Sequence, residues 1–271
     1  MAIKHKILAL MHDPKRASKY LCAMLRGDHD VANRIRIDYQ TSSISAKVIR
    51  IFPDSSREIN HAFTELFSSK FHSYMKVKAS DDYVRSAAQG LPIHEEGLLY
   101  VLARLARPTK IVETGVGPGV STAYLLKALE DNGCGHLYSI DMPTMDQELQ
   151  ETRPEYRMHP NRKKTRTKQT LRPSGWLVPE YLKNRWTLQV GLSSSLLPPL
   201  LAEVGEIDLF VHDSDHTYRN MMFEFTSAWP HLRKGGMLIS DDTEWNNAFS
   251  DFAIERGQTG IELGRLGAII K

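Results

Sequence analysis

The middle of the chain reads Lys110-Ile-Val-Glu-Thr-Gly-Val-Gly-Pro-Gly-Val-Ser-Thr-Ala-Tyr124, an apolar run followed by a glycine-rich turn and the start of a helix. Gly115, Gly117 and Gly119 allow the backbone to turn sharply and to approach a ligand where a Cβ atom would collide. A turn at the carboxyl end of a strand lies where open α/β sheets bind their ligands. Because glycine-rich turns are widespread, the spacing alone predicts a ligand without specifying which one.

Strands and helices alternate around this turn. The apolar runs predicted as strands are Lys110–Thr114, His136–Ile140, Trp186–Val190, Ile207–His212 and Gly236–Ser240. Helical periodicity is found in Pro92–Leu105, Val120–Glu130, Ser194–Val204, Tyr218–Leu232 and Trp245–Arg256. Gly260–Ile270 is too short for another crossover helix and fits two strands joined by a tight turn. The pattern predicts an α/β fold with a doubly wound, Rossmann-like, seven-stranded, mostly parallel sheet and a C-terminal antiparallel strand.

The chain divides into an N-terminal segment, 1–90, and a catalytic domain, 91–271. The first segment shows helical periodicity in pieces, including Arg57–Met75, whereas Ala46–Phe52 is compatible with a strand or a loop. We expect this mainly helical segment to act as a cap or to form a homo-oligomer. Residues 143–174 are polar and basic, and they are interpreted either as a mobile flap over the site or as a solvated loop.

Composition excludes several classes of protein. The net charge of only +3 does not indicate a polyanionic partner, and 41% hydrophobic residues are enough for a sizeable core. Cys22 and Cys134 lack metal-ligand spacing and do not suggest a disulfide framework. No signal peptide and no stretch long enough to cross a membrane is found. We therefore expect a soluble, cytoplasmic protein.

Two carboxylates narrow the ligand of the glycine-rich turn. The spacing is Gly-x-Gly-x-Gly, which differs from the spacing that presents a helix N-terminus to pyrophosphate. Glu113 is predicted at the mouth of the turn, where it would repel a phosphate and suit a cationic ligand such as a sulfonium amino acid. Asp141 follows the second strand, where an acidic residue can hold a ribose diol. Read alone, Asp141 is also compatible with a turn or a helix cap.

These residues resemble the first two motifs of class I S-adenosylmethionine-dependent methyltransferases. The resemblance covers Leu91 to Lys271 and is greatest to metal-dependent O-methyltransferases that act on sugars and other natural products. Gly191-Leu-Ser-Ser-Ser-Leu-Leu-Pro198 is similar to the turn that lines the adenine in such enzymes, although Ser193–Ser195 alone would be read as a helix N-cap. The cofactor-binding residues that the resemblance implies are Glu113, Gly115, Gly117, Gly119, Ser121, Thr122, Asp141, Gly191, Ser193, Ser194 and Asp213.

Acidic residues follow the fourth and fifth predicted strands. Asp213 and Asp215 come after one strand, and Asp241 and Asp242 after the other. Because adjacent parallel strands end at the same edge of a sheet, we expect the four carboxylates to converge, which requires a cation or protons to neutralise them. Oxygen ligands favour Mg²⁺ or Mn²⁺. The alternative interpretation is that these aspartates cap the two following helices.

The resemblance assigns roles within this acidic group. It implies that Asp213, Asp241 and Asp242 bind the metal, with Asp213 also catalytic, and that His216 is the base that removes a hydroxyl proton. Together these features predict Mg²⁺-assisted O-methylation of a hydroxylated small molecule, such as a sugar or glycoside. The alternatives are a nucleic-acid or protein methyltransferase that uses the basic stretch 162–172, and a non-catalytic protein that binds S-adenosylmethionine. The basic stretch lacks the aromatic residues that stack on bases, which disfavours nucleic acid.

Overall fold

The computed structural model of the chain describes residues 14–28, 31, 35, 41–43, 45–78, 94–142 and 173–271. The strands are β1 (Lys110–Thr114), β2 (His136–Asp141), β3 (Trp186–Val190), β4 (Ile207–His212), β5 (Leu232–Ser240), β6 (Ile261–Glu262) and β7 (Gly267–Ile270). The α-helices are α2 (Pro14–Leu25), α4 (Ser56–Ser68), α5 (Lys70–Lys78), α7 (His94–Ala106), α8 (Val120–Asn132), α10 (Ser193–Val204), α11 (Tyr218–Ala228) and α12 (Ala248–Glu255). Two 3₁₀ helices, η4 (Glu180–Arg185) and η5 (Trp229–His231), precede β3 and β5.

The strands form one seven-stranded sheet in the order β3-β2-β1-β4-β5-β7-β6. Neighbours from β3 to β5 are parallel, whereas β7 runs antiparallel to both β5 and β6. The predicted fold class is therefore confirmed, including the C-terminal antiparallel strand. The strand order reverses direction between β1 and β4, and such a switch point opens a crevice at the carboxyl ends of the two strands.

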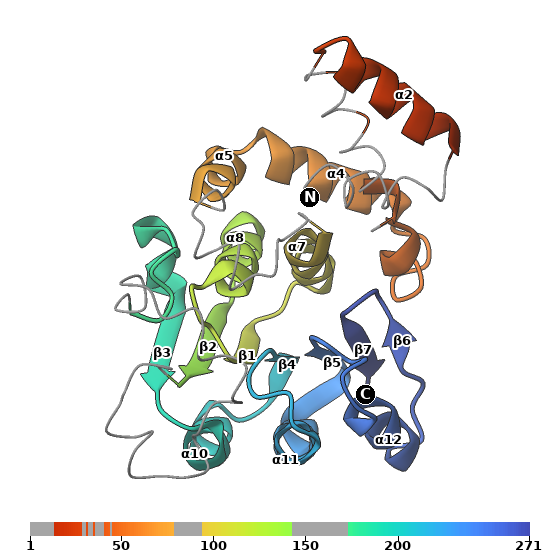
Figure 1. The fold of residues 1–271 in the computed structure, drawn as a ribbon. Coiled ribbons are helices and arrows are strands. Elements are labelled where there is room, and N and C mark those ends of the chain that lie inside the picture. The colour runs from red at the N-terminus through yellow and green to blue at the C-terminus, as the bar shows by residue number, and fades with distance from the viewer. Residues whose placement is uncertain are drawn as a thin grey trace, which may run out of the picture.

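Helices cover both faces of the sheet, as Figure 1 shows. α4, α5, α7 and α8 lie on one side, α10, α11 and α12 lie on the other, and α2 lies outside α4. Each layer has its own apolar core, represented by Leu102 and Leu125 on the first side and by Phe210 and Phe225 on the second. Because parallel strands are buried on both faces, their apolar residues form nearly continuous runs. This explains why β1 and β4 are recognisable from sequence.

The N-terminal helices differ in detail from the prediction. Arg57–Met75 is not one helix, because the chain becomes extended at Ser69 between α4 and α5. The hydroxyl of Ser69 accepts a hydrogen bond from the His72 backbone N–H at 3.1 Å, which caps the start of the second helix. Within Ala46–Phe52, for which a strand or a loop was expected, the chain is helical up to Val48 and then turns.

Other boundaries moved by a few residues. The helix predicted for Tyr218–Leu232 ends at Ala228, and β5 already begins at Leu232. Pro230 accounts for this change, because proline lacks the N–H that a continuing helix requires. At the end of the chain, β6 and β7 are joined by a turn in which the Leu263 N–H donates to the Leu266 carbonyl at 2.8 Å.

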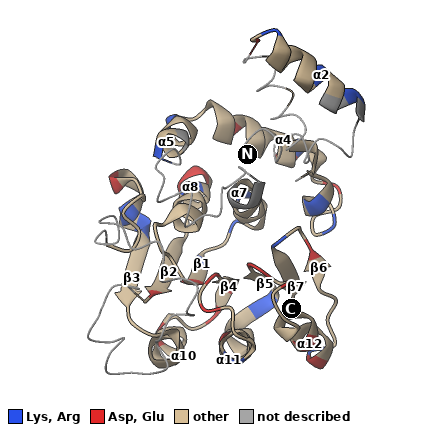
Figure 2. Cartoon of the chain, viewed as in Figure 1, with Lys and Arg blue, Asp and Glu red and all other residues tan. Residues whose placement is uncertain are grey.

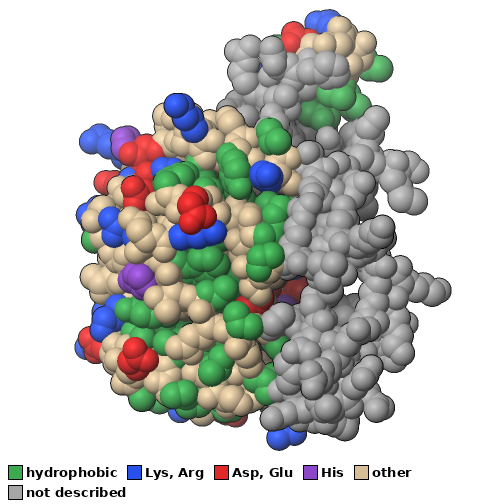
Figure 3. Space-filling model, turned by 90° about the vertical axis from the view of Figure 1, so that its left-hand side faces the viewer, with side chains coloured by type: hydrophobic (Ala, Val, Ile, Leu, Met, Phe, Trp, Pro, Cys, Tyr) green, Lys and Arg blue, Asp and Glu red, His purple; other side chains and the backbone are tan. Residues whose placement is uncertain are grey.

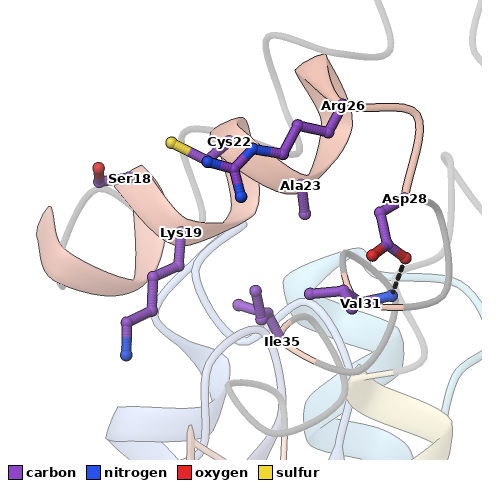
Figure 4. A pocket seen from close by; sticks show the side chains of 8 residues that line it. All are labelled: Ser18, Lys19, Cys22, Ala23, Arg26, Asp28, Val31 and Ile35. Carbon is purple, nitrogen blue, oxygen red and sulfur yellow. Dashed lines mark hydrogen bonds between the residues drawn. The ribbon is translucent and has the colours of Figure 1, made fainter.

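A small cavity of about 280 Å³ lies beside α2. Figure 4 shows Lys19, Arg26 and Asp28 around it, with the Val31 N–H donating to the Asp28 carboxylate at 3.1 Å.

Over the described part of the face in Figure 3, acidic, basic and apolar side chains are interspersed. None of the described helices is long and apolar enough to span a membrane.

Most of the predicted flap, 143–172, lies outside the described residues, and the division at residue 90 stays a prediction.

Candidate active site

The glycine-rich turn packs against two other loops. Gly115 has φ +87°, and a Cβ atom there would lie 1.9 Å from the carbonyl oxygen of Asp213. Gly119 has φ +92°, and its Cβ would lie 2.7 Å from the Cα atom of Gly175. At Gly117, with φ +51°, an added Cβ would have no atom of the described residues within 4 Å. The sequence interpretation assigned all three glycines to close approach of a ligand, whereas contact between loops of the protein itself requires Gly115 and Gly119.

Glu113 is fully buried, so its predicted place at the mouth of the turn is wrong. Its carboxylate accepts hydrogen bonds from the hydroxyls of Ser121 (2.9 Å), Thr122 (2.8 Å) and Ser139 (2.7 Å). The parallel strand β1 is covered on both faces, which encloses this side chain although the turn follows two residues later. Glu113 thus joins β1, β2 and the first turn of α8, and supports the loop from within.

Burial gives Glu113 a pH-dependent effect on stability. Desolvation raises the pKa of its carboxyl from 4.5 to about 7, against the opposing effect of the three hydroxyl donors. The folded protein therefore binds this proton more tightly than the unfolded chain does. The stabilisation is complete at low pH and is lost as the pH rises through about 7.

We expect the free energy of unfolding of the wild type, minus that of Glu113→Gln, to fall by about 2–3 kcal/mol between pH 5 and pH 8. Urea denaturation followed by circular dichroism would measure this difference. Glu203→Gln, at an exposed position of α10, is the control and should show no such trend. A pH-independent difference for Glu113→Gln would show that the carboxyl does not titrate in this range.

Asp141 ends β2 and points into the glycine-rich turn. Its Oδ1 atom accepts hydrogen bonds from the backbone N–H groups of Val116 (2.9 Å) and Gly117 (3.3 Å). Its Oδ2 atom accepts a hydrogen bond from the hydroxyl of Ser174. Asp141 is therefore next to the turn, as predicted, and it caps none of the described helices. Sequence reasoning did not identify Ser174, which follows a long polar stretch without a recognisable motif.

The predicted adenine turn lies at the end of β3. The Gly191 N–H donates to the Asp141 carbonyl at 2.9 Å, which brings this turn beside the end of β2. Ser193 begins α10 and is half-buried, while Ser194 is exposed. The alternative interpretation of the serines as a helix N-cap is wrong, because Leu192 occupies the N-cap position and no side chain caps the helix.

Asp213, His216 and Asp241 converge at the carboxyl edge of the sheet. One potential ligand atom from each lies within 4.8 Å of the others, and the His216 Nε2 atom is 4.0 Å from Asp213 Oδ1. Backbone hydrogen bonds fix both strand ends, from the Asp213 N–H to the Thr114 carbonyl (2.8 Å) and from the Asp241 N–H to the His212 carbonyl (2.9 Å). Figure 2 shows acidic residues gathered near the ends of β1, β4 and β5. We call Asp213, His216 and Asp241 the rim cluster.

Two of the four aspartates expected to converge lie outside the rim cluster. Asp215 is exposed and accepts a hydrogen bond from the Thr217 hydroxyl at 3.1 Å. Asp242 has φ +48°, and its carboxylate accepts a hydrogen bond from Arg265 Nε at 2.8 Å. Arg265 also donates to Asp241 Oδ2 at 3.0 Å. The resemblance implied Asp242 as the third metal ligand, whereas the structure groups His216 with the other two aspartates.

The aspartates do not cap the following helices, so the capping alternative is wrong. Thr217 caps α11 through a hydrogen bond that its side chain accepts from the Asn220 N–H at 3.3 Å. Asn247 occupies the N-cap position of α12 and makes no side-chain capping bond. Asp213 and Asp241 are therefore held at the rim without a role in helix termination.

Electrostatic effects within the rim cluster favour a neutral imidazole. Burial, reinforced by the charge of His212, lowers the pKa of His216 below its ordinary value. Burial and then the charge of Asp241 raise the pKa of Asp213. Because 39% of the Asp213 side chain remains exposed, solvent screens part of this effect. A neutral His216 can accept a proton at physiological pH.

A buried polar network that the sequence analysis missed supports the rim. Glu224, on α11, accepts hydrogen bonds from His212 Nδ1 (2.6 Å), the Ser214 hydroxyl (2.8 Å) and Asn220 Nδ2 (3.1 Å), as well as from the Thr114 hydroxyl. Burial alone would raise the pKa of Glu224, but the hydrogen bond and charge of His212 outweigh it and lower the pKa. An acidic residue on the apolar face of a predicted helix was the available signal.

Trp245 and Asn246 approach the rim from the loop after β5. The indole ring of Trp245 lies 5.2 Å from the His216 ring, centroid to centroid, and 53% of this residue is exposed. Asn246 Nδ2 donates to the His216 carbonyl at 2.9 Å, which links the two loops that carry the rim cluster. Neither residue stands in a motif, so only the tertiary structure brings them to the site.

Comparison with known proteins identifies the class of enzyme. Residues 112–243 match the family model of a methyltransferase domain, and this range includes the glycine-rich turn, Asp141 and the rim cluster. The chain therefore carries a methyltransferase domain. The predicted class, S-adenosylmethionine-dependent methyltransferase, is confirmed. No curated protein matches the chain.

Several solved structures are similar to the chain. An O-methyltransferase from Bacillus cereus in complex with SAH is 15% identical, covers 74% of this chain and 90% of its own, and has a TM-score of 0.43. A methyltransferase from Geobacter sulfurreducens is 19% identical, covers 72% of this chain and 88% of its own, and has a TM-score of 0.48. The O-methyltransferase TomG from Streptomyces achromogenes, involved in tomaymycin synthesis and in complex with SAM, is 18% identical. It covers 67% of this chain and 81% of its own, with a TM-score of 0.43.

Proposed function

We propose that this methyltransferase transfers the methyl group to a hydroxyl of a small molecule with the help of a divalent cation. The observation that supports this proposal is the rim cluster, in which two carboxylates and an imidazole converge beside the glycine-rich turn. The contact between Gly115 and the Asp213 backbone brings the two loops together. A methyl donor held by the first loop would then lie next to an acceptor held at the second.

On the cofactor side, the turn and Asp141 would bind S-adenosylmethionine. We propose that Asp141 receives the ribose, that Gly117 lies against the cofactor, and that Gly191, Ser193 and Ser194 line the adenine. Asp213 would contact the cofactor from the rim. Ser121 and Thr122 each donate a hydrogen bond to Glu113, so we assign these three residues to support of the turn. No atom in the described part of the chain lies within 4 Å of a Cβ built on Gly117, and this fits a cofactor placed there.

The donor set of the rim cluster fits a divalent cation. Asp241 Oδ1 and His216 Nε2 are buried and have no hydrogen-bond partner among the described residues. Buried polar atoms without partners are costly, so a bound ion would satisfy Asp241 Oδ1, and the hydroxyl of a bound acceptor would satisfy His216 Nε2. Asp213 and Asp241 would hold Mg²⁺ or Mn²⁺, with Asp242 close by and neutralised by Arg265. Such an ion would lower the pKa of an acceptor hydroxyl bound to it.

The protein residues would position the acceptor and accept its proton. His216 is proposed as the base, because its lowered pKa keeps the imidazole neutral and its Nε2 atom faces the carboxylates. The network around Glu224 holds the loop that carries His216. Since the sulfonium methyl group is already reactive, most of the acceleration would come from alignment of the two substrates.

A combined binding and activity experiment tests this function. We expect S-adenosylhomocysteine to bind in a calorimetric titration, and at least one sugar, glycoside or catechol to be methylated in the presence of Mg²⁺ or Mn²⁺. Removal of the metal with EDTA should reduce the rate at least tenfold, and added Mg²⁺ should restore it. Full activity under strict chelation would contradict the metal assignment. Transfer only to RNA or to protein would contradict the acceptor class.

A further inference from the structure

The carboxylate of Asp141 is nearly saturated with hydrogen bonds. A carboxylate offers about four acceptor positions, two on each oxygen. Val116 N–H and Gly117 N–H occupy the two positions of Oδ1, and the Ser174 hydroxyl occupies one position of Oδ2. Only 8% of Asp141 is exposed, so water has little access to what remains. Among the described residues, none occupies the second position of Oδ2, so one acceptor position is left for a ligand.

Ser174 belongs to a short segment, 173–178, that lies across the glycine-rich turn and that we call the strap. The Gly175 N–H donates to the Gly117 carbonyl at 2.8 Å, and the Leu177 N–H donates to the Pro118 carbonyl at 3.0 Å. The close approach of Gly119 to Gly175 leaves no room for a side chain between them. The strap backbone is thus fixed on the turn, whereas the half-buried Ser174 side chain can rotate about χ1.

We propose that Ser174 competes with the ribose of the cofactor for Asp141 and thereby sets the affinity for S-adenosylmethionine. This inference rests on the proposed assignment of the ribose to Asp141. A ribose diol donates two hydrogen bonds, but Asp141 has one acceptor position free. The second ribose hydroxyl must therefore replace the hydroxyl of Ser174. Rotation of one side chain is sufficient, and the strap backbone keeps its hydrogen bonds to the turn.

Such a competition weakens the binding of S-adenosylmethionine and of S-adenosylhomocysteine alike. The same hydroxyl that is displaced when S-adenosylmethionine binds can return to Asp141 as S-adenosylhomocysteine departs. Many enzymes are limited by product release, so a side chain that favours release can increase turnover. The position of Ser174, anchored by a strap that does not have to move, suits this role.

Calorimetric titration of the full-length protein with S-adenosylhomocysteine tests the proposal. Ser174→Ala should bind about three to ten times more tightly than the wild type, because the ribose no longer replaces a hydrogen bond. Ser250→Ala, an exposed serine on α12, is the matched control and should bind like the wild type. Thermal unfolding of each variant verifies that the fold is retained. Unchanged or weaker binding by Ser174→Ala would overturn the competition.

Asp141→Asn separates this proposal from the ribose assignment on which it rests. Its side-chain oxygen can still accept from the Val116 and Gly117 N–H groups, so the turn should be preserved. We expect this variant to bind S-adenosylhomocysteine at least tenfold more weakly, and Ser174→Ala to have no further effect in its background. If Asp141→Asn binds normally, the ribose assignment is wrong and the competition falls with it. If it binds weakly but Ser174→Ala does not tighten binding, only the competition is overturned.

Discussion

Asp241→Asn is expected to reduce methyl transfer at least a hundredfold while leaving the affinity for S-adenosylhomocysteine within about threefold of the wild type. Asp241 belongs to the rim cluster, and its Oδ1 is one of the buried atoms without a partner in the described part of the chain. Asparagine keeps the size of the side chain but removes the charge that would attract both a cation and the imidazolium of protonated His216.

Asp215→Asn is the matched control, because Asp215 is exposed near the rim cluster but does not belong to it. Its rate should stay within about threefold of the wild type, because an exposed charge outside the cluster contributes little. The measurement is kcat and KM with an acceptor from the substrate screen, together with the cofactor titration. Equal activity of Asp241→Asn and Asp215→Asn would contradict the assignment of the rim cluster to catalysis.

Gly115→Ala is expected to lower the free energy of unfolding by about 3–5 kcal/mol or to prevent folding altogether. Its φ of +87° is unfavourable for alanine, and the new Cβ atom would lie 1.9 Å from the Asp213 carbonyl oxygen. The backbone after β4 would have to move, although the Asp213 N–H bond to Thr114 holds it. The predicted defect is therefore in stability as well as in activity.

Gly117→Ala provides the contrast within the same turn. Its φ of +51° is left-handed, but no atom of the residues that the structure describes lies within 4 Å of the added Cβ. We expect a loss of only about 1–2 kcal/mol from backbone strain. Denaturant unfolding of both variants measures the difference. If the two substitutions destabilise equally, the contact between the turn and the loop after β4 does not explain the glycine at position 115.

Motifs whose residues lie close together in the chain could be interpreted from the sequence. The run from Lys110 to Tyr124 predicts a strand, a turn and a helix, and β1 and α8 begin at the expected residues. Ser69 marks where such local reasoning was insufficient, because a serine that bonds to backbone groups interrupts a continuous helical pattern. The intrinsic preferences of the residues distinguish a helix from a strand more easily than they reveal a break within a helical pattern.

Side-chain environments depended on contacts that sequence spacing does not encode. The carboxylate of Glu113 is inside the protein because β1 is covered from both sides, although the residue stands next to a turn. Asp242 pairs with Arg265, which follows it by 23 residues and approaches from the loop between β6 and β7. The residues around each carboxylate decide whether it is charged and whether it can bind a ligand.

The sequence by itself determined the class of this protein, because a strand, a Gly-x-Gly-x-Gly turn and a helix are local features, and alternating apolar runs specify a parallel sheet. It also predicted that acidic residues would meet at one edge of that sheet, since parallel strands end together. Only the tertiary structure decided which of them meet. The directions of the acidic side chains depend on the strand register, on the strap and on helix α11. All three are contacts between residues that lie far apart in the chain. For that reason His216, and not Asp242, stands with Asp213 and Asp241, and Ser174 stands at Asp141.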